Sequence, residues 1–438
     1  RSLRDFVPLT ENVVNMYVCG PTVYNYIHIG NARSAVAFDT IRRYFEYCGY
    51  TVNYISNFTD VDDKIIKAAN EAGISTKELS DKFIAAFMED TGQLGIKPAT
   101  QNPRVINYMD EIIAFVSTLV DKGFAYVSEG DVYFRVAKSN NYAKLANKTL
   151  EDLEIGASGR TDAETERKEN PLDFALWKAA KEGEVSWDSP WGLGRPGWHI
   201  ECSVMATEIL GDTIDIHGGG ADLEFPHHTN EIAQSEAKTG KTFANYWMHN
   251  GFVNVDNEKM SKSLGNFVTV HDMLKTVDGQ VLRFFLATQQ YRKPINFTEK
   301  AIHDAEVNLK YLKNTHSLPL TDQVNQDELQ TYLEAFQEAM DDDFNTANGV
   351  TVLFDMAKWI NSGNYDQTVK DAFEKMIQVF GIVFEEEVLD EDIEKLIEER
   401  QAARANKDFA TADRIRDELA AQGIKLLDTK EGVRWTRD

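Results

Sequence analysis

Three cysteines in 438 residues are too few for a disulfide framework. No apolar run approaches the length of a membrane span, and nothing at the start resembles a signal peptide. The sequence also contains no internal repeat and no low-complexity tract. These absences exclude a disulfide-rich secreted domain and predict a cytoplasmic protein with no membrane partner. Because the first residue is Arg1 rather than Met, we expect a few residues to precede it.

Positive charge is also scarce. Lys and Arg number 46 against 71 Asp and Glu, which gives a formal net charge of −25. Bulk, non-specific binding of nucleic acid needs clustered Lys and Arg, so this composition argues against it. The net charge leaves room for a localised basic track, and a nucleic-acid partner would then be read by shape and local contacts. The length is sufficient for two to four domains.

The clearest local pattern is a strand, a loop and a helix. Residues 13–18 form an apolar run typical of a buried strand, Gly20-Pro21 interrupts it, and residues 31–47 have the spacing of an amphipathic helix. This unit predicts an α/β fold with a doubly wound, Rossmann-like parallel sheet. Ligands bind such sheets over the carboxyl ends of the strands and at helix N-termini. Cys19 and His28 are therefore placed to meet a ligand.

The remaining patterns divide the chain into segments. Residues 124–127 and 132–136 predict a hairpin, the sheet is expected to resume at 174–177, and an aromatic-rich connector is expected over 243–252. Nearly all of 298–380 has helical spacing. We expect six segments: the two halves of the α/β domain (1–115 and 195–243), an insertion between them (116–194), a loop-bearing connector (244–297), a helical bundle (298–385) and a small C-terminal domain (386–438).

Two short motifs carry the first sign of chemistry. His28-Ile29-Gly30-Asn31 opens the first helix, and Lys259-Met260-Ser261-Lys262-Ser263 lies far downstream. A histidine before a helix is usually a cap neighbour and a Lys-Ser loop is usually a solvated turn, but the pair in this order resembles the two signatures of class I aminoacyl-tRNA synthetases. An imidazole, helix N–H groups and two lysines would stabilise phosphate charge while a carboxylate attacks ATP. Asn31 departs from the usual histidine and still offers a donor.

A second group of residues has metal-ligand chemistry. His227 and Glu231 are four residues apart in a helical pattern, so they share one face. With Cys19 and Cys202 they form a credible zinc set of two thiolates, an imidazole and a carboxylate. The sequence has no CxxC motif, so spacing alone also allows two small buried cysteines and a core histidine. We expect Cys48, at a helix end, to be a buried structural cysteine.

Longer blocks extend the resemblance over essentially the whole chain. Pro21-Thr22-Val23-Tyr24, Asn57-Phe58-Thr59-Asp60, the run 195–203 (RPGWHIECS) and the run 217–228 (HGGGADLEFPHH) resemble the cysteinyl-tRNA synthetase family. The resemblance implies one zinc ion per chain, held by the residues that match the family's ligands: Cys19, Cys202, His227 and Glu231. His228 is not expected to be a ligand, because only His227 has the four-residue step to Glu231.

The resemblance also implies substrates and partners. These are L-cysteine, ATP with Mg²⁺ and the tRNA for cysteine, tRNA(Cys), bound by a monomer. Nucleotide binding is expected at His28, Gly30, Asn31, Gly218, Gly219, Lys259 and Lys262, of which His28, Asn31, Lys259 and Lys262 are catalytic. The amino-acid pocket is expected at Gly20, Thr59, Trp198, His217 and Asp222. Zinc would prefer a thiolate to a hydroxyl, and the insertion is too small for an editing domain, so selection without editing is expected.

The C-terminal region has a composition suited to RNA. Cations at Arg404, Lys407, Arg414 and Arg416 precede the run 432–437 with its Trp435. Unpaired bases are read by stacking and edge hydrogen bonds, so an anticodon-binding role is expected, although a solvated helix face with a core tryptophan explains any one residue equally well.

Two other functions are compatible with the motifs. A ligase that joins cysteine to an amino sugar in mycothiol synthesis would share the ATP signatures and the zinc set, but it has no use for an anticodon domain. An inert paralogue that binds nucleotide or RNA would not need His28, Lys259 and Lys262 intact. Cysteine-dependent ATP–pyrophosphate exchange and the choice of acceptor separate the three.

Overall fold

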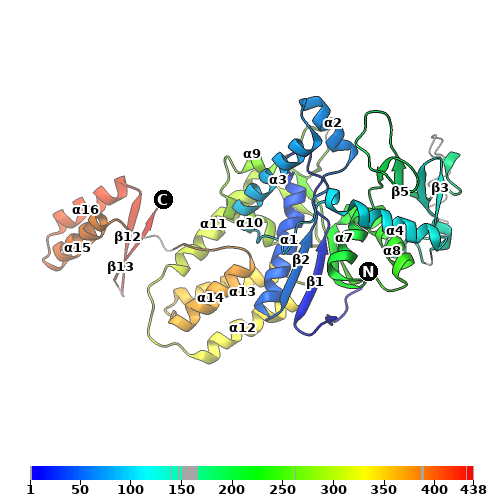
Figure 1. Ribbon diagram of the computed structural model, residues 1–438. Helices are drawn as coiled ribbons and strands as arrows, with labels where there is room; N and C mark the ends of the chain where they lie inside the picture. Colours follow the sequence, from blue (N-terminus) through cyan, green and yellow to red (C-terminus); the bar gives the residue numbers. More distant parts are fainter. Residues whose placement is uncertain are drawn as a thin grey trace.

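The computed structural model describes residues 2–139, 141–146, 148–149, 166–261, 263–385, 389–430 and 432–437. Three bodies follow one another in Figure 1: an α/β part, a helical bundle and a small C-terminal unit at the far end from the α/β part. The predicted fold class is confirmed. Among the described residues, no helix combines the length and apolarity needed to cross a membrane.

A four-stranded parallel sheet organises the α/β part. Its strands are β1 (Val13–Val18), β2 (Thr51–Ser56), β7 (Ile214–Gly220) and β8 (Ala244–Asn250), in the order β2-β1-β7-β8. The chain runs from β1 to β2 on one side and returns to β7 on the other, so the sheet has a switch point between β1 and β7. A crevice at the carboxyl ends of these two central strands is the expected place for a ligand.

Helices cover both faces of this sheet. Helix α1 (Ile29–Tyr47) packs Phe38 and Ile41 on the face formed by Met16 and Val18. Helices α4 (Met109–Asp121), α7 (Ile200–Leu210) and α8 (Thr229–Thr239) lie over the other face, around Tyr17 and neighbouring side chains. Because successive strand residues point to opposite faces, the mixed apolar run of β1 supplies both cores.

Two predicted segments differ from the structure. Residues 174–177 belong to β5 (Phe174–Ala179), which joins β3 (Ala125–Ser128), β4 (Asp131–Phe134) and β6 (Gly194–Pro196) in a separate antiparallel sheet, so the parallel sheet does not resume there. The hairpin formed by β3 and β4 is confirmed. The connector expected over 243–252 instead contains β8, so the parallel sheet extends beyond residue 243. A short apolar run does not reveal which sheet it joins.

Smaller elements border the ends of the strands. Helices α2 (Asp63–Ala72) and α3 (Thr76–Gln93) follow β2, and the short turns are η1 (Val105–Tyr108), η2 (Val136–Lys138), η3 (Ala221–Leu223) and η4 (Glu224–His228). A three-stranded sheet carries the Lys259 loop. Its strands, in the order β10-β9-β11, are β9 (Val253–Val255), β10 (Glu258–Lys259) and β11 (Ile295–Phe297). Helices α9 (Val270–Met273) and α10 (Gly279–Ala287) lie between β10 and β11 in the sequence, and the bundle follows β11.

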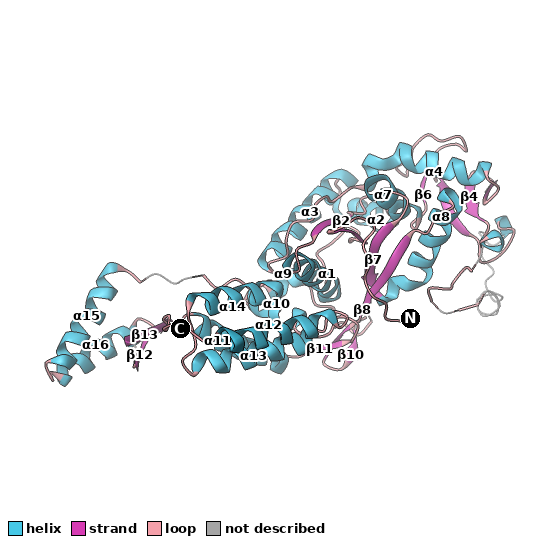
Figure 2. Ribbon diagram, turned by 90° about the horizontal axis from the view of Figure 1, so that it is seen from below, coloured by secondary structure: helices cyan, strands magenta, loops and turns pink. Residues whose placement is uncertain are grey.

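The bundle continues the α/β core without a gap. Figure 2 shows its helices beside α1 and α10: α11 (Glu299–His316), α12 (Gln326–Asp341), α13 (Thr346–Asn361) and α14 (Gln367–Val379). A buried ion pair, Arg283 Nη1 to Asp39 Oδ2 at 2.7 Å, joins α10 to α1. The C-terminal unit has its own small core and consists of α15 (Glu391–Ala405), α16 (Phe409–Ala421), β12 (Ile424–Thr429) and β13 (Gly432–Arg437).

Candidate active site

A cavity of about 870 Å³ lies over the carboxyl ends of β1, β7 and β8, at the N-terminus of α1. Its volume is in the range of pockets that bind a small ligand. Its wall includes Cys19, His28, Trp198, Asp222, Asn250 and Lys259, which come from six different segments of the chain. The crevice expected from the sheet order is therefore present, and it joins the two predicted chemical centres.

Four predicted metal ligands converge at one end of this cavity. Cys19 Sγ lies 3.7 Å from Cys202 Sγ, 3.5 Å from His227 Nε2 and 3.7 Å from Glu231 Oε2. His227 Nε2 and Glu231 Oε2 are 3.2 Å apart. In a tetrahedral zinc site two sulfurs are about 3.8 Å apart, a sulfur and a nitrogen about 3.6 Å, and a nitrogen and an oxygen about 3.4 Å, from the usual bond lengths. The donor atoms therefore fit one zinc ion.

His228 also reaches this cluster. Its Nε2 lies 3.5 Å from Cys19 Sγ and 3.8 Å from Glu231 Oε2, and a second possible donor set consists of Cys19, His217, His228 and Glu231. In that set, however, His217 Nε2 and Glu231 Oε1 are 2.8 Å apart, a hydrogen-bond distance shorter than an edge of a zinc tetrahedron. The first set fits better. The prediction that His228 is not a ligand therefore stays a prediction. The four-residue step could not decide it alone, because a residue three positions before Glu231 also lies on the same helix face.

The electrostatics of the cluster favour a cation. Burial raises the pKa of Cys19 well above its usual range and raises that of Glu231, while burial lowers the pKa of His227. In the described parts of the chain, no Lys or Arg forms an ion pair with Cys19, Cys202 or Glu231. Burial therefore disfavours the charged forms of these groups, and a metal ion would reverse that preference by stabilising the thiolates.

Hydrogen bonds orient two of these ligands from behind. His217 is fully buried, and its Nε2 lies 2.8 Å from Glu231 Oε1, which leaves Glu231 Oε2 facing Cys19. His199 Nδ1 lies 3.0 Å from His227 Nδ1, and burial lowers the pKa of His199 to about 3. A neutral His199 can accept a hydrogen bond from the His227 Nδ1–H, which leaves His227 Nε2 free to ligate. The sequence interpretation missed His199, although it lies only three residues before Cys202.

His28 caps the first helix and lines the cavity. Its Nδ1 accepts a hydrogen bond from the Asn31 backbone N–H at 3.2 Å, and Asn31 Oδ1 accepts one from the His28 N–H at 3.2 Å. Burial lowers the pKa of His28, and Asp222 partly opposes this shift. Because Nδ1 is an acceptor, the proton of the neutral ring is on Nε2, which can donate to a phosphate. Gly30 contacts the imidazole so closely that a Cβ would lie 2.9 Å from it.

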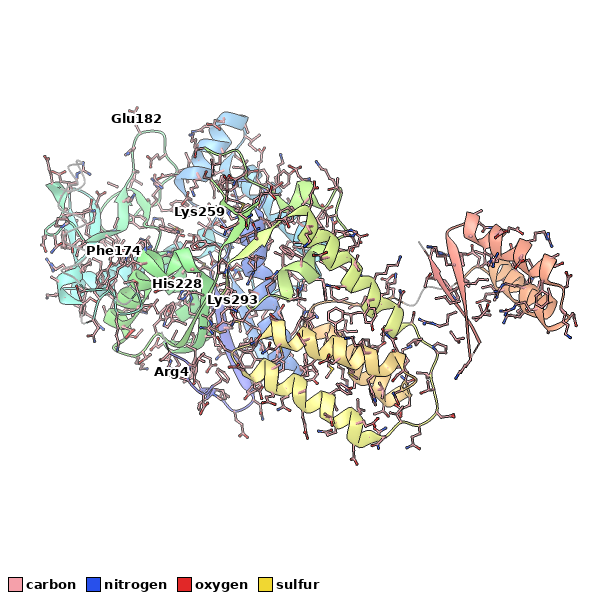
Figure 3. All side chains as sticks on the ribbon, turned by 180° about the vertical axis from the view of Figure 1, so that it is seen from behind. Arg4, Phe174, Glu182, His228, Lys259 and Lys293 are labelled. Carbon is pink, nitrogen blue, oxygen red and sulfur yellow. The ribbon has the colours of Figure 1, made fainter. Side chains whose placement is uncertain are left out.

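The two signature motifs are joined by backbone hydrogen bonds. The Ile29 N–H donates to the Val268 carbonyl at 2.9 Å and the Val270 N–H donates to the Ile27 carbonyl at 3.0 Å, around a bridge between His28 and Thr269. Lys259 is exposed, and its Nζ lies 5.5 Å from the centre of the Phe252 ring, while Phe267 meets the His28 ring edge to face. Figure 3 labels Lys259 at this loop and His228 at the metal cluster. Lys262 lies outside the described residues.

Three of the five predicted amino-acid contacts lie close to the metal cluster. Trp198 stacks on His227 with ring centres 4.7 Å apart, and the Thr59 hydroxyl accepts a hydrogen bond from Asn57 at 3.0 Å. The Gly20 N–H donates to Asn57 Oδ1 at 3.1 Å. These residues and Asp222 line the cavity. His217 does not line it, because it lies behind Glu231 as a hydrogen-bond partner.

The glycines at the end of β7 are arranged differently from the expectation. The Phe38 ring packs so closely on Gly218 that a Cβ would lie 2.4 Å from it, and a Cβ on Gly219 would lie 2.9 Å from Leu223. Neither glycine lines the cavity, whereas Gly220 does. Phe252, Phe267 and Asn250 also line it and were missed; only the strand pattern of 244–250 could have indicated the last.

In the C-terminal unit, some of the cations are paired internally. Arg404 Nη1 lies 2.5 Å from Asp428 Oδ2, which also binds Arg400. Trp435 is half-buried, with the Arg437 guanidinium 5.9 Å from its ring centre. Lys407 and Arg414 are exposed. The expected RNA contacts in this unit remain predictions.

Comparisons with known proteins agree with this arrangement. Residues 5–307 match the tRNA synthetases class I (C) catalytic domain, residues 335–385 match the DALR domain, and residues 386–435 match the cysteinyl-tRNA ligase anticodon binding domain. A cysteine–tRNA ligase from Streptococcus thermophilus (strain CNRZ 1066) is 94 % identical over 438 residues, which is 100 % of this chain and 98 % of that protein. One from Streptococcus agalactiae serotype III (strain NEM316) is 82 % identical with the same coverage.

Solved structures show a related fold at low identity. Mycobacterium tuberculosis methionyl-tRNA synthetase in complex with methionyl-adenylate superposes with a TM-score of 0.62 at 14 % identity, covering 84 % of this chain and 89 % of that one. The Agrobacterium radiobacter K84 agnB2 LeuRS in its ternary complex with tRNA and LeuAMS superposes with a TM-score of 0.61 at 11 % identity, covering 86 % and 84 %.

Proposed function

The chain belongs to the cysteinyl-tRNA synthetase family, class I ligases that join cysteine to tRNA, and from this premise we propose how its site selects and activates the amino acid. The enzyme forms cysteinyl-adenylate from L-cysteine and ATP with Mg²⁺, and it transfers cysteine to the 3′ end of tRNA(Cys). We propose that it acts as a monomer and works in the cytoplasm.

The observation that carries the proposal is the convergence of Cys19, Cys202, His227 and Glu231 at zinc-like distances. Zinc bound there would supply a soft Lewis acid that prefers the sulfur of cysteine to the oxygen of serine. Around it, Trp198 provides an aromatic wall beside His227, and Thr59 a hydroxyl at the cavity surface. The carboxylate of Asp222 would attract the ammonium group of the amino acid.

The other end of the cavity suits the triphosphate. His28 Nε2 and the N-terminal N–H groups of α1 can donate to phosphate oxygens, and Gly30 allows close approach of the nucleotide. Lys259 and Lys262 would neutralise the charge that develops on pyrophosphate when the carboxylate of cysteine attacks the α-phosphorus. The N-terminus of α1 would therefore position ATP, and the loop lysines would stabilise the transition state.

Selection without editing is part of the proposal. A site that depends on one substrate group can reject an analogue lacking it by about 10⁴- to 10⁵-fold, which makes hydrolytic correction unnecessary. The described part of the insertion forms a small antiparallel sheet packed on α4 and α7, with a core shared with the parallel sheet. A shared core leaves little of this segment for an independent hydrolytic domain.

The two alternatives have less support. A ligase acting on an amino sugar does not use the anticodon binding domain that residues 386–435 match. An inert nucleotide-binding paralogue would not need the cap formed by His28 and Asn31 together with a converged donor set.

One experiment tests the proposal. Purified protein with its metal content measured by mass spectrometry is assayed for cysteine-dependent ATP–pyrophosphate exchange and for charging of tRNA(Cys). We expect close to one zinc per chain, exchange with cysteine and far less with serine, and charged tRNA. Exchange that is equal with cysteine and serine, or independent of zinc, would contradict the proposed selection.

A further inference from the structure

Asn250 is a buried cavity residue that the activity described above does not use. It is the last residue of β8, at the carboxyl edge of the parallel sheet, and its side chain is only 3 % exposed. It nevertheless belongs to the wall of the cavity, beside Gly220 and Gly251. A buried polar side chain at this edge needs either a partner in the protein or a ligand.

The carbonyl oxygen of this side chain has no partner among the described residues. Asn250 Nδ2 donates to the Gly251 carbonyl at 3.1 Å, which fixes the amide so that Oδ1 is the remaining group. Oδ1 is buried and accepts no hydrogen bond. Leaving a buried acceptor unpaired is costly, so the cavity presents a hydrogen-bond acceptor that a ligand donor would satisfy.

The backbone that carries Asn250 is held firmly. The Gly251 N–H donates to the Tyr291 carbonyl at 2.8 Å, and a Cβ on Gly251 would lie 2.5 Å from the backbone of Lys293. The buried guanidinium of Arg33 in turn donates to the carbonyls of Gln290 and Lys293, at 2.9 and 3.3 Å. Lys293 is labelled in Figure 3 on this turn. Oδ1 is therefore a fixed acceptor rather than a mobile surface group.

The neighbouring residue shows which end of the cavity Oδ1 faces. His249 Nε2 lies 2.8 Å from His228 Nδ1, so His249 points toward the metal cluster. Successive residues of a strand point to opposite faces, which directs Asn250 toward the face covered by α1, where His28 begins the helix. The acceptor thus belongs to the nucleotide end and not to the amino-acid end.

The surroundings narrow the ligand group further. Asn250 Oδ1 lies 4.0 Å from the position that a Cβ of Gly220 would occupy, and Gly220 lines the cavity. An acceptor there repels phosphate oxygens, and it matches adenine poorly because ring acceptors flank the amino group of that base. A ribose hydroxyl can rotate to donate to Oδ1. We propose that Asn250 is a specificity-determining residue whose Oδ1 accepts a hydrogen bond from a ribose hydroxyl of ATP.

This inference rests on the proposed adenylation, and the test compares nucleotides one hydroxyl at a time. Pyrophosphate exchange is measured for the wild type and Asn250→Ala with ATP, 2′-deoxyATP, 3′-deoxyATP and purine riboside triphosphate, which lacks the adenine amino group. We expect one of the two deoxy analogues to lower kcat/KM of the wild type by about 10- to 100-fold, the effect of leaving a buried acceptor unpaired. In Asn250→Ala the penalty for that analogue should vanish, while the purine riboside penalty stays unchanged.

The matched control is Asn245→Ala, on the same strand but away from the cavity wall. It should keep the discrimination of the wild type. A wild type that accepts both deoxy analogues as well as ATP would overturn the inference, whether or not Asn250→Ala folds. So would a penalty that moves onto the purine riboside. Absence of exchange with ATP itself would instead count against the proposed function, and calorimetry with AMP and its deoxy forms would then test Asn250 separately.

Discussion

The two ends of the cavity are built in opposite ways. The metal end consists of buried side chains on rigid elements: Cys202, His227 and Glu231 are each at most 4 % exposed. The nucleotide end depends on exposed groups on a loop, with Lys259 resting over Phe252. Selection of a substrate requires fixed geometry, whereas charge stabilisation along a reaction requires groups that can follow the substrate. The comparison indicates that this enzyme separates the two tasks in space.

The largest effect is expected from removing a ligand at the metal end of the cavity. Cys202→Ser replaces a soft ligand by a hard one, so metal affinity should fall by more than about 100-fold, beyond the effect of losing a supporting hydrogen bond. Preference for cysteine over serine in pyrophosphate exchange should fall on the order of 10³-fold. Zinc content by mass spectrometry and exchange with both amino acids check this. Cys48→Ser is the control, since Cys48 is exposed at the end of α1 and the prediction that it is buried was wrong. Unchanged zinc in Cys202→Ser would refute the ligand assignment.

The next largest effect is expected at the nucleotide end of the cavity. Lys259→Ala removes a cation from the loop and should slow adenylate formation by about 100-fold, as removal of one charge-stabilising donor does in other active sites. Zinc content and cysteine affinity should not change, because the metal cluster lies at the opposite end. Single-turnover kinetics and calorimetry measure the two quantities. Lys241→Ala, which breaks an exposed ion pair with Asp212, serves as control; a parallel loss of zinc in Lys259→Ala would mean that the two ends are coupled.

A pH experiment examines His28, which caps α1. Burial lowers the pKa of His28 below its usual 6.5, so protonation favours the unfolded chain. The stability contributed by this group is complete above pH 6.5 and is lost as the pH falls below it, when the cap at Nδ1 is replaced by a proton. Loss of a helix cap costs about 1 kcal/mol. His28→Asn keeps a cap acceptor without titrating, so its thermal stability should fall less than that of the wild type between pH 7 and 5. An NMR titration giving His28 a pKa above 6.5 would contradict this account.

The smallest effect is expected from Phe252, whose ring lies under Lys259. Phe252→Leu keeps an apolar wall but removes the aromatic face under Lys259. A cation–π contact at an exposed site is worth about 0.5–1 kcal/mol, so kcat/KM for ATP should change only about 2- to 5-fold. A loss as large as that of Lys259→Ala would show that Phe252 contacts the nucleotide directly, and an equal change in zinc binding would again join the two ends.

Sequence patterns predicted the metal-ligating side chains better than they predicted which neighbouring residues line the cavity. For Cys19, Cys202, His227 and Glu231, side-chain type and a four-residue step gave a credible zinc set, and the family resemblance then implied it as the ligand set. His228 could not be separated by spacing, since the three-residue step to Glu231 also places it on the same helix face. Gly218 and Gly219 read as a nucleotide loop, but the Phe38 ring of α1 covers the first of them.

The missed residues share a physical cause. Asn250 lies in β8, in the segment 243–252 whose aromatic composition led us to predict a connector. Its proposed role depends on a buried side-chain oxygen that has no hydrogen-bond partner among the described residues. The direction of an amide and the absence of a partner are properties of the packed structure, and no single-sequence pattern contains them. His199 could be recognised only from its distance to His227, which depends on how the start of α7 packs against η4.

The antiparallel bridge between His28 and Thr269 has a mechanical consequence. It fastens the end of the loop to the start of α1, and Asn266 closes the loop internally by bonding the backbone of Ser261 and Lys259. The turns that precede and close the loop, at Asp256-Asn257 and Gly265, have positive φ angles. Lys259 is thus carried on a short loop whose far end is hydrogen-bonded to the residues around the start of α1. The position of Lys259 is therefore tied through the backbone to that of His28, although the two residues are more than 200 positions apart in the sequence.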